Sequence, residues 1–470
     1  MNGGRISHSL PDHIDAEADV VVIGAGACGL VAALRARAAG AEVMVLERDV
    51  SPSGSTSMSS GFVPAPATRF QRAIGVEDDT PERFEADIMA KSKGKSVASL
   101  TQLAAQAIGP ALEWLADMHG LEWIVLDDFL YPGHSRHRMH AVPEKTGAAL
   151  EARLLAAVEA AEIPVVTEAH VTALYADAED RITAVEITRP DGAREVLGCK
   201  ALVLACNGFG GNAALVREHI PEIAEGLYYG HQGNTGDALI WGETLGARID
   251  HLSGYQGHGS LAHPHGILIS WALMMEGGIQ VNADGVRFSN EHGGYSEQAV
   301  NVLAQPGGIA WNIYDARLHA FAQGFPDYQE AMAAGAIREA ADVGELAWVT
   351  GLPETALSVT LTEVARFQSG KADDPFGRNF TGKPALLAPF HAVKVTGALF
   401  HTQGGLKIDD QARVVRDDGT PFANLFAGGG AACGVSGPDV SGYLSGNGLL
   451  TAIGFGFVAG HAAGTSVVSG

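Results

Sequence analysis

The chain has 470 residues, of which 46% are hydrophobic, 18% are charged and 60 are glycines. This length predicts two or three domains, and the composition is typical of a globular protein with many tight loops. The net charge of −23 argues against nucleic acid or an anionic membrane surface as a partner. The four cysteines have neither CxxC pairing nor metal-ligand spacing, which argues against a thiol–disulfide reductase and predicts no metal site.

The two ends of the chain give no targeting signal. The N-terminal segment lacks the charged-then-apolar pattern of a signal peptide. The last apolar stretch, Leu449 to Gly460, is shorter than the ~20 residues that cross a bilayer. We therefore expect a cytoplasmic protein without a transmembrane segment.

The first pattern along the chain is a strand, a glycine-rich turn and a helix, followed by a second strand. Residues 19–23 (DVVVI) are apolar throughout and predict a buried parallel strand. Gly24, Gly26 and Gly29 then permit a tight turn, close approach of a pyrophosphate and close helix–strand packing. The second strand ends on Glu47, whose carboxylate would accept hydrogen bonds from ribose hydroxyls. The unit predicts a dinucleotide site at a helix N-terminus.

The next segment favours FAD over NAD. Residues 53–61 (SGSTSMSSG) form a run of hydroxyls and glycines directly after the second strand. Such a loop suits a long cofactor whose pyrophosphate and ribityl chain extend beyond the first turn. Taken alone, the same run is also typical of a flexible linker.

The rest of the chain alternates between helical and strand patterns. We expect helices at 97–118, 147–160 and 446–463, and strands near 164–176, 181–188, 194–205, 404–409 and 425–427. This predicts an α/β fold: a Rossmann-like FAD-binding domain (parallel sheet plus β-meander) interrupted by an inserted α+β capping domain that binds the substrate. We place the FAD-binding domain at 1–240 and 386–470, and the capping domain at 241–385.

Eight motifs in order resemble the FAD-dependent fumarate reductase and 3-ketosteroid dehydrogenase superfamily, most closely the 3-ketosteroid 4-ene (5α) dehydrogenase type. They are VVVIGAGACGLVAAL…VMVLERD, SGSTSMSSG, LVLACNGFGGN, NTGDA, VNADGVRFSNE, HTQGGLKID, NLFAGGG and GYLSGNGLL. The resemblance spans nearly the whole chain and implies these FAD-binding residues: Gly24, Gly26, Cys28, Gly29, Glu47, Arg48, Ser55, Thr56, Ser59, Gly61, Val171, Asn207, Gly208, Asp237, Gly429, Asn447 and Leu449.

The chain departs from the family pattern at two positions that concern the flavin. The family's ATGG segment is replaced by residues 205–208 (ACNG), and Gly430 stands where many members have an acidic residue. Members that bind FAD covalently use a histidine near the Ser/Thr loop, and none occurs between Glu47 and Gly61. The resemblance therefore implies non-covalent FAD.

The substrate-side residues separate this chain from the dicarboxylate enzymes it resembles. Those enzymes hold a diacid with arginines, because a planar guanidinium can form two parallel hydrogen bonds with a carboxylate. One of these arginines also transfers the proton. Tyr295 and Tyr443 stand at the two arginine positions, and Ser270-Trp271 replaces a Thr-Glu pair. His258 and His401 match histidines that the dicarboxylate enzymes use. A neutral, apolar ketone is then favoured over a diacid.

The resemblance assigns chemistry to two segments. Desaturating a ketone beside its carbonyl requires a base for the α-proton and donors to the oxygen, while the flavin accepts the hydride. Tyr295 is the candidate base, although a phenol ordinarily has a pKa of about 10 and needs help. Tyr443 is a donor to the ketone oxygen, with Ser445 on the same side if the segment is extended. The amides of Gly446 and Asn447 would face either that oxygen or the N1–C2=O edge of the reduced flavin.

Four alternatives stay open at this point. The same architecture serves an ene-reductase fed by an external donor, and a fumarate or succinate enzyme that uses the histidines alone. A flavin monooxygenase would ordinarily need a fast NAD(P)H reaction, and no second dinucleotide motif occurs. A non-catalytic electron carrier would not need the large inserted domain. Ring size, regiochemistry, the external electron acceptor and any role in steroid metabolism are not determined by the sequence.

Overall fold

The computed structural model describes residues 5–9 and 11–468. The chain divides into two compact units, each with its own sheet and hydrophobic core. Unit 1 comprises Met1–His219, Gly230–Tyr255 and His401–Gly470, and unit 2 comprises Ile220–Tyr229 and Gln256–Phe400.

Unit 1 is built on a nine-stranded sheet with the order β1-β8-β9-β10-β2-β3-β7, extended by β21 on β10 and by β20 on β21. Strands β7, β3, β2, β10 and β21 are parallel neighbours, whereas β8, β9 and β10 form an antiparallel meander. The strands are β1 (Arg5–Ser7), β2 (Ala16–Ile23), β3 (Val43–Leu46), β7 (Val165–Val166), β8 (His170–Ala176), β9 (Ile182–Thr188), β10 (Arg194–Leu204), β20 (Arg413–Val415) and β21 (Pro421–Ala427).

Smaller strands and, within the described residues, eight α-helices complete unit 1. The short strands are β4 (Val63–Pro64), β5 (Ile124–Val125), β6 (Met139–Ala141), β12 (Ile249–Asp250) and β19 (Gly405–Leu406). The helices are α1 (Ala27–Ala38), α2 (Arg69–Ala73), α3 (Pro81–Lys91), α4 (Ala98–His119), α5 (Gly147–Ala160), α6 (Ala213–His219), α7 (Asp237–Thr244) and α14 (Asn447–Val468).

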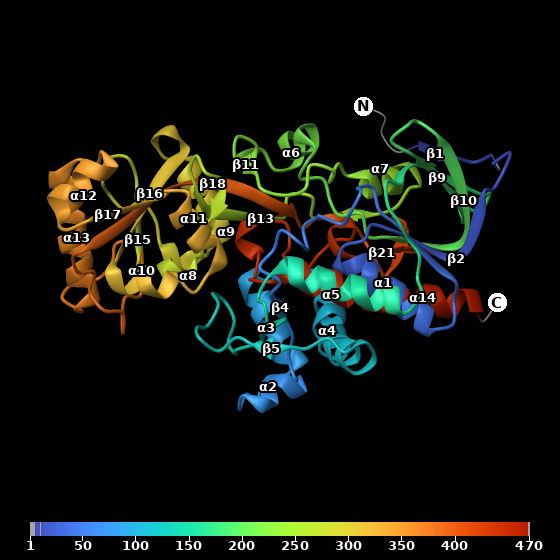
Figure 1. Cartoon of the computed structure of the whole chain (residues 1–470), viewed down its shortest axis with the longest axis horizontal. Coiled ribbons are helices and arrows are strands. Elements are labelled where there is room, and N and C mark those ends of the chain that lie inside the picture. The colour runs from blue at the N-terminus through green and yellow to red at the C-terminus, as the bar shows by residue number, and fades with distance from the viewer. Residues whose placement is uncertain (1–4, 10, 469–470) are drawn as a thin grey trace. The chain divides into compact units, whose positions relative to one another are not determined.

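The glycines of the last helix have a packing role. Helix α14, red in Figure 1, runs alongside α1, which is blue. A Cβ on Gly460 would lie 2.1 Å from the carbonyl oxygen of Ala32, so only glycine lets the two backbones approach this closely. The sequence correctly predicts this helix but ends it at 463, five residues short of Val468.

Helix α14 is also the one helix among the described residues that is long and apolar enough to cross a membrane by length and composition. It is longer than the apolar stretch expected from the sequence, but 56% of its most apolar window is buried inside the protein. Burial against α1, α4 and the sheet is what a core helix requires.

Unit 2 is built on a seven-stranded sheet with the order β14-β13-β18-β16-β15, to which β11 and β17 add through β18. Its strands are β11 (Leu227–Tyr228), β13 (Tyr255–Ala262), β14 (Ile267–Leu268), β15 (Ile279–Val281), β16 (Ile309–Asp315), β17 (Ile337–Ala340) and β18 (Phe390–Thr402). Its helices are α8 (Ala272–Met275), α9 (Tyr295–Leu303), α10 (Ala316–Ala322), α11 (Pro326–Ala333), α12 (Val343–Thr350) and α13 (Glu354–Gln368).

The predicted fold class is confirmed: a parallel sheet with a β-meander, interrupted by an α+β unit. The bounds of the inserted unit differ from the predicted 241–385. Helix α7 and strand β12 pack with β19 in unit 1, whereas β18 pairs with β16 in unit 2 along residues 390–396. Both pairings join segments far apart in the chain, so local sequence patterns did not reveal them. The capping role of unit 2 stays a prediction.

Candidate active site

The glycine-rich turn between β2 and α1 has the shape of a phosphate site. A Cβ on Gly24 would lie 2.5 Å from the Ala205 carbonyl oxygen, and a Cβ on Gly29 would lie 1.9 Å from the Gly24 carbonyl oxygen. Gly26 caps α1 without a side-chain hydrogen bond, and the first turn contains no acidic residue. The first amides of a helix have no intrahelical acceptor, so this helix end can bind an anion.

Cys28 lies in the first turn of α1 and is not a reactive thiol. Its side chain is buried, and burial raises the pKa of the thiol to about 12. The thiol is therefore neutral at physiological pH, which suits the predicted packing role beside the cofactor rather than redox chemistry.

Glu47 lies beside the same turn. One carboxylate oxygen accepts a hydrogen bond from the Ala25 amide at 3.0 Å, and the other accepts from the Asp49 amide at 3.0 Å. The amide of Ala169 donates to the Glu47 carbonyl oxygen, which brings the start of β8, and with it buried Val171, close to this residue. The carboxylate is thus fixed at the carboxyl end of β3, where a dinucleotide ribose binds in such folds.

The Ser/Thr loop is held against the glycine-rich turn. Thr56 Oγ1 accepts from the Ala27 amide at 2.9 Å, and Ser59 Oγ donates to the Thr56 carbonyl oxygen at 2.7 Å. Gly61 adopts a positive φ of 72°, and a Cβ there would lie 2.7 Å from the Thr146 carbonyl. The loop predicted to bind the cofactor is therefore part of the same cradle.

The two departures from the family pattern, at residues 205–208 and at Gly430, lie next to each other in the structure. Asn207 has a positive φ of 66°, and its Nδ2 donates to Ser55 Oγ at 2.8 Å. A Cβ on Gly430 would lie 2.2 Å from Asn207 Oδ1, so the asparagine side chain occupies the space of any larger residue at 430. The polar side chain of Asn207 therefore stands where a side chain on residue 430 would otherwise lie.

Other predicted cofactor residues lie around this cradle. Arg48 Nη2 donates to Asp237 Oδ2 at 2.8 Å, which ties the end of β3 to the start of α7. Gly429 approaches Cys28, since a Cβ on it would lie 3.3 Å from Cys28 Cβ. Gly208 is enclosed by Thr402, whose Oγ1 would lie 2.0 Å from an added Cβ.

The start of α14 presents unsatisfied polar groups. Asn447 is fully buried, and its Oδ1 has no hydrogen-bond partner among the described residues. The amides of Gly448 and Leu449 belong to the first turn and have no intrahelical acceptor. The Asn447 amide, in contrast, donates to the Leu444 carbonyl oxygen at 3.0 Å and is not available as predicted. An orphaned buried oxygen beside two amides fits the polar edge of a flavin ring.

These features together fit FAD. The glycine-rich turn would hold the pyrophosphate, and Glu47 would hold the adenosine ribose. The Ser/Thr loop, with Asn207, would hold the ribityl chain, and the start of α14 would hold the flavin ring. Non-covalent binding stays a prediction: acid precipitation should release all the yellow colour into the supernatant, and colour left in the pellet would contradict it.

Replacing Glu47 by alanine is expected to weaken FAD binding by about 1.5–3 kcal/mol, because the ribose loses a charged acceptor. Titration of the apoprotein with FAD, followed by flavin fluorescence, measures the Kd. Glu47→Gln is the matched control, since it keeps an acceptor oxygen without the charge and should bind FAD with intermediate affinity. An unchanged Kd in the alanine variant would remove Glu47 from the site.

The substrate-side residues of unit 1 lie on and around the last glycine-rich loop. Tyr443 and Ser445 are buried at 5% and 4% exposure, and the Tyr443 ring lies 5.5 Å from the His401 ring at 74°. Tyr443 has extended backbone, and the Asn447 amide then closes a turn onto the Leu444 carbonyl oxygen. The expectation that the side chains of Tyr443 and Ser445 share a face stays a prediction.

His401 belongs to a hydrogen-bonded chain that the sequence did not reveal. Gln403 Nε2 lies 3.0 Å from His401 Nδ1, and Gln403 Oε1 accepts from Ser436 Oγ at 2.6 Å. Ser436 Oγ in turn accepts from Asn447 Nδ2 at 3.0 Å. His401 Nδ1 also lies 3.3 Å from the Thr402 carbonyl oxygen, so the contacts of the neutral ring are compatible with a proton on either nitrogen. Burial lowers the pKa of His401 to about 4, which keeps it neutral.

The substrate-side residues of unit 2 form a ring cluster, defined here as His258, Trp271, Tyr295 and Phe400. The imidazole is stacked between Tyr295 at 4.9 Å and Phe400 at 5.2 Å, with Trp271 edge-on at 6.0 Å. The Ser260 amide donates to His258 Nδ1 at 3.1 Å, and burial lowers the pKa of His258 to about 3. His258 is thus a neutral ring with its proton on Nε2. The sequence did not reveal Phe400.

Two buried arginines of unit 2 are committed to internal partners. Arg287 pairs with Glu291 at 2.7 Å and with Asp374 at 2.6 Å. Arg378 pairs with Glu291 at 3.1 Å and donates to two backbone carbonyls. Trp271 Nε1 donates to the Glu291 carbonyl oxygen, so this ion cluster supports the ring cluster. Both guanidinium groups serve the fold rather than a ligand.

Buried neutral histidines make stability depend on pH. Burial lowers the pKa of His134 and His258 to about 3 and of His140 and His401 to about 4. The unfolded chain takes up these protons near pH 6.5, so it binds more protons than the folded chain below that pH. Each group should cost about 1 kcal/mol of stability between pH 6.5 and 5.5.

Urea unfolding of the holoprotein at pH 7 and at pH 5.5, with FAD in fixed excess, measures this loss. His140→Gln is the matched variant. Its free energy of unfolding should fall less between the two pH values, because the contribution of one buried histidine is removed. Equal stability at the two pH values would contradict the neutral buried state.

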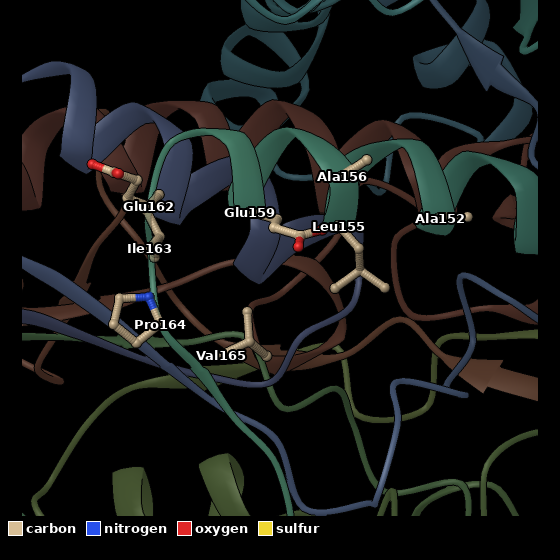
Figure 2. A pocket seen from close by; sticks show the side chains of 8 residues that line it. All are labelled: Ala152, Leu155, Ala156, Glu159, Glu162, Ile163, Pro164 and Val165. Atoms are coloured by element: carbon tan, nitrogen blue, oxygen red, sulfur yellow. The ribbon is translucent and has the colours of Figure 1, made fainter.

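Unit 1 also has a surface pocket. It has a volume of about 660 Å³ and is bounded by one face of α5 and the chain that leads into the edge strand β7 (Figure 2). Its lining is Ala152, Leu155, Ala156, Glu159, Glu162, Ile163, Pro164 and Val165. None of the predicted site residues lies in it.

Comparison with known proteins agrees with the cofactor cradle. Residues 19–449 match the family described as FAD binding domain. NADH:fumarate oxidoreductase of Klebsiella pneumoniae is 28% identical over 449 residues, covering 95% of this chain and 47% of the relative, so the chain spans about half of that protein. 4-Oxocyclohexanecarboxylate 2-dehydrogenase of Sinomonas cyclohexanicum is 26% identical over 517 residues, covering 88% of this chain and 87% of the relative.

Solved structures share the fold. A flavocytochrome c3 fumarate reductase in its open conformation has a TM-score of 0.81 at 26% identity and covers 97% of this chain and 79% of its own. The 3-ketosteroid Δ4-(5α)-dehydrogenase of Rhodococcus jostii has a TM-score of 0.77 at 24% identity and covers 99% of both chains. With its glycine-rich turn, ordered Ser/Thr loop and family match, the chain belongs to the FAD binding domain family and is a flavin-dependent oxidoreductase with FAD as its cofactor.

Proposed function

We propose that this protein is an FAD-dependent dehydrogenase that forms a C=C bond next to the carbonyl of a cyclic ketone, either a 3-ketosteroid or a smaller ring. The observation that carries the proposal is the uncharged ring cluster of unit 2. His258 is neutral there, and its neighbours are a phenol, a phenyl ring and an indole. Such a surface suits an apolar ring and offers a diacid no charge to pair with.

The internal ion pairs of the two buried arginines also support a ketone rather than a diacid as the substrate. A diacid needs guanidinium groups that are free to form paired hydrogen bonds with carboxylates. Arg287 and Arg378 are already neutralised by Glu291 and Asp374. Freeing Arg287 would leave the buried Asp374 carboxylate without its guanidinium partner, which costs about 3–5 kcal/mol.

Two of the similar proteins carry matching names. One is a 2-dehydrogenase of a 4-oxocyclohexanecarboxylate, and one is a 3-ketosteroid dehydrogenase with the same fold. The first supports a small ring ketone as substrate class, and the second supports a larger one.

The proposal gives the residues distinct roles. FAD, when bound, accepts the hydride from the β-carbon of the ketone. Tyr443 Oη and the Ser445 hydroxyl donate to the ketone oxygen as negative charge builds on it. Tyr295 Oη takes the proton from the α-carbon, so that the two C–H electron pairs become the new double bond and the hydride.

Tyr295 has a local source of help for this role. It is the first residue of α9, where the helix end carries partial positive charge that favours a phenolate. Glu297 lies in the same turn and acts in the opposite direction. The stacked His258 contributes no charge, because it is neutral.

A dicarboxylate oxidoreductase is the second candidate. It is favoured by the similarity to the Klebsiella fumarate oxidoreductase and by the two buried neutral histidines, of which His258 carries its proton on Nε2. An ene-reductase is the same chemistry run in the opposite direction. The steroid assignment and a role in steroid metabolism belong to the first candidate.

Anaerobic mixing of the oxidised holoprotein with a panel of ligands tests the proposal. The panel contains cyclohexanone, 4-oxocyclohexanecarboxylate, a saturated 3-ketosteroid and succinate, and the measurement is bleaching of the flavin absorbance. We expect bleaching with at least one ketone and none with succinate. Bleaching with succinate alone would establish the dicarboxylate function instead. The dithionite-reduced holoprotein mixed with the matching enones and with fumarate tests the reverse direction.

A further inference from the structure

His134 is a buried histidine of unit 1 that the proposed function does not use. It lies in the loop before β6, is 6% exposed and stacks on Phe84 at 5.9 Å. Its Nε2 lies 2.9 Å from the carbonyl oxygen of Ser445, 311 positions further along the chain. Its Nδ1 lies 3.4 Å from Arg138 Nη1.

The direction of these two hydrogen bonds is fixed by Arg138. A guanidinium only donates, so His134 Nδ1 accepts from it. Burial, with the nearby Arg138 charge, lowers the pKa of His134 to about 3, and the ring therefore carries a single proton. That proton is on Nε2 and is donated to the Ser445 carbonyl oxygen.

Arg138 is itself held rigidly. The side chain is fully buried, and it donates to Asp79 at 2.9 and 2.6 Å and to Asp87 at 2.5 Å. Asp79 also accepts from buried Gln71 at 2.8 Å. A network in which Arg138 is paired with two carboxylates and all three groups are hydrogen-bonded can hold the histidine in a fixed position.

The peptide that His134 contacts has one orientation. The peptide plane is rigid and trans, so a carbonyl turned toward His134 turns the Gly446 N–H in the opposite direction. Gly446 has a φ of +86°, and an added Cβ would lie 2.6 Å from Pro64 Cδ. Its N–H has no acceptor within hydrogen-bond distance among the described residues.

We propose that His134 is a positioning residue that holds the Ser445–Gly446 peptide so that the Gly446 N–H is presented to the ketone oxygen. This rests on the proposed function. The amide strengthens its hydrogen bond as charge builds on that oxygen, and it acts beside the side chains of Tyr443 and Ser445. A fixed amide requires no reorganisation during the reaction, which is where its effect on rate comes from.

The test compares three substitutions of His134 in the holoprotein. In His134→Gln, the side-chain amide nitrogen reaches the position of the imidazole Nε2 and can donate to the Ser445 carbonyl oxygen. His134→Asn is its matched control, because the same amide is one methylene too short. His134→Leu keeps an apolar side chain against Phe84 and removes the donor.

Two measurements are made on each variant. The first is the rate of flavin reduction at saturating cyclic ketone, together with the half-saturating concentration. We expect the Asn and Leu variants to be about 10- to 100-fold slower, with half-saturation nearly unchanged, because misplacing a donor acts on the transition state. The Gln variant should recover most of the wild-type rate.

The second measurement is hydrogen exchange of the peptide that covers residues 443–450, which needs no substrate. The Asn447 and Leu450 amides are bonded to Leu444 and Gly446 on either side of the anchored peptide. Their exchange should be about 2- to 10-fold faster in the Asn and Leu variants, as when one hydrogen bond is lost, and near wild type in the Gln variant.

The two measurements test the anchoring contact and the positioning role separately. Equal exchange in wild type and in the Leu and Asn variants would overturn the anchor. Faster exchange with an unchanged reduction rate would overturn the positioning role. If the wild type oxidises no ketone, the proposed function fails and the positioning role fails with it, whereas the exchange data still decide whether His134 anchors the peptide.

Discussion

Tyr295→Phe should keep FAD bound but slow flavin reduction by a ketone substrate about 10²–10⁴-fold, the usual effect of losing a positioned acid or base. Tyr295 opens helix α9 and stacks on His258 at 4.9 Å, and phenylalanine preserves that packing. Only the hydroxyl is lost, so half-saturation by the ketone should change little. Anaerobic stopped-flow absorbance of the flavin measures both quantities.

The control is Tyr314→Phe, which removes a hydroxyl elsewhere in unit 2. Tyr314 Oη lies 2.7 Å from Tyr328 Oη, and Tyr328 keeps His319 as a second partner. This variant should lose about 1 kcal/mol of stability and reduce its flavin at the wild-type rate. A Tyr295→Phe enzyme as fast as wild type would exclude Tyr295 as the base.

Tyr443→Phe should lower the same rate about 10²–10³-fold, or about 3–4 kcal/mol, because one donor to the developing enolate oxygen is removed. Ser445→Ala should cost less, since the backbone amides remain. Ketone binding should weaken only modestly in both, because the donors act once charge has built up. Tyr443→Arg should abolish ketone turnover by burying a cation against an apolar ring.

Tyr175→Phe is the matched control in unit 1. Its hydroxyl lies 3.3 Å from Glu186 on the meander, among strands that carry no predicted substrate residue. Turnover of succinate or fumarate alone, with Tyr443→Phe unimpaired, would remove the ketone proposal and leave the two histidines as the substrate contacts. A double variant of Tyr295 and Tyr443 adds a further check: effects that are not additive indicate one shared step.

The sequence by itself determined the cofactor domain. The turn that follows Ile23, the acidic residue at the end of β3 and the hydroxyl-rich loop act through local geometry: helix-end amides, backbone approach and a fixed spacing along the chain. The strands of the meander and the helices α4, α5 and α14 were likewise visible, because burial imposes a periodic pattern on neighbouring residues.

Only the tertiary structure decided the rest. It assigned β18 to the second sheet, stacked Phe400 on His258, and tied His134 to Ser445. It also showed that Asn207 fills the space beside Gly430. Arg287 forms ion pairs with Glu291 and Asp374, and Arg378 forms one with Glu291. Apart from Arg287 and Glu291, which are four positions apart, each of these contacts joins residues far apart in the chain, and such pairs leave no periodic or spacing signal in a single sequence. Packing of the whole unit selects them.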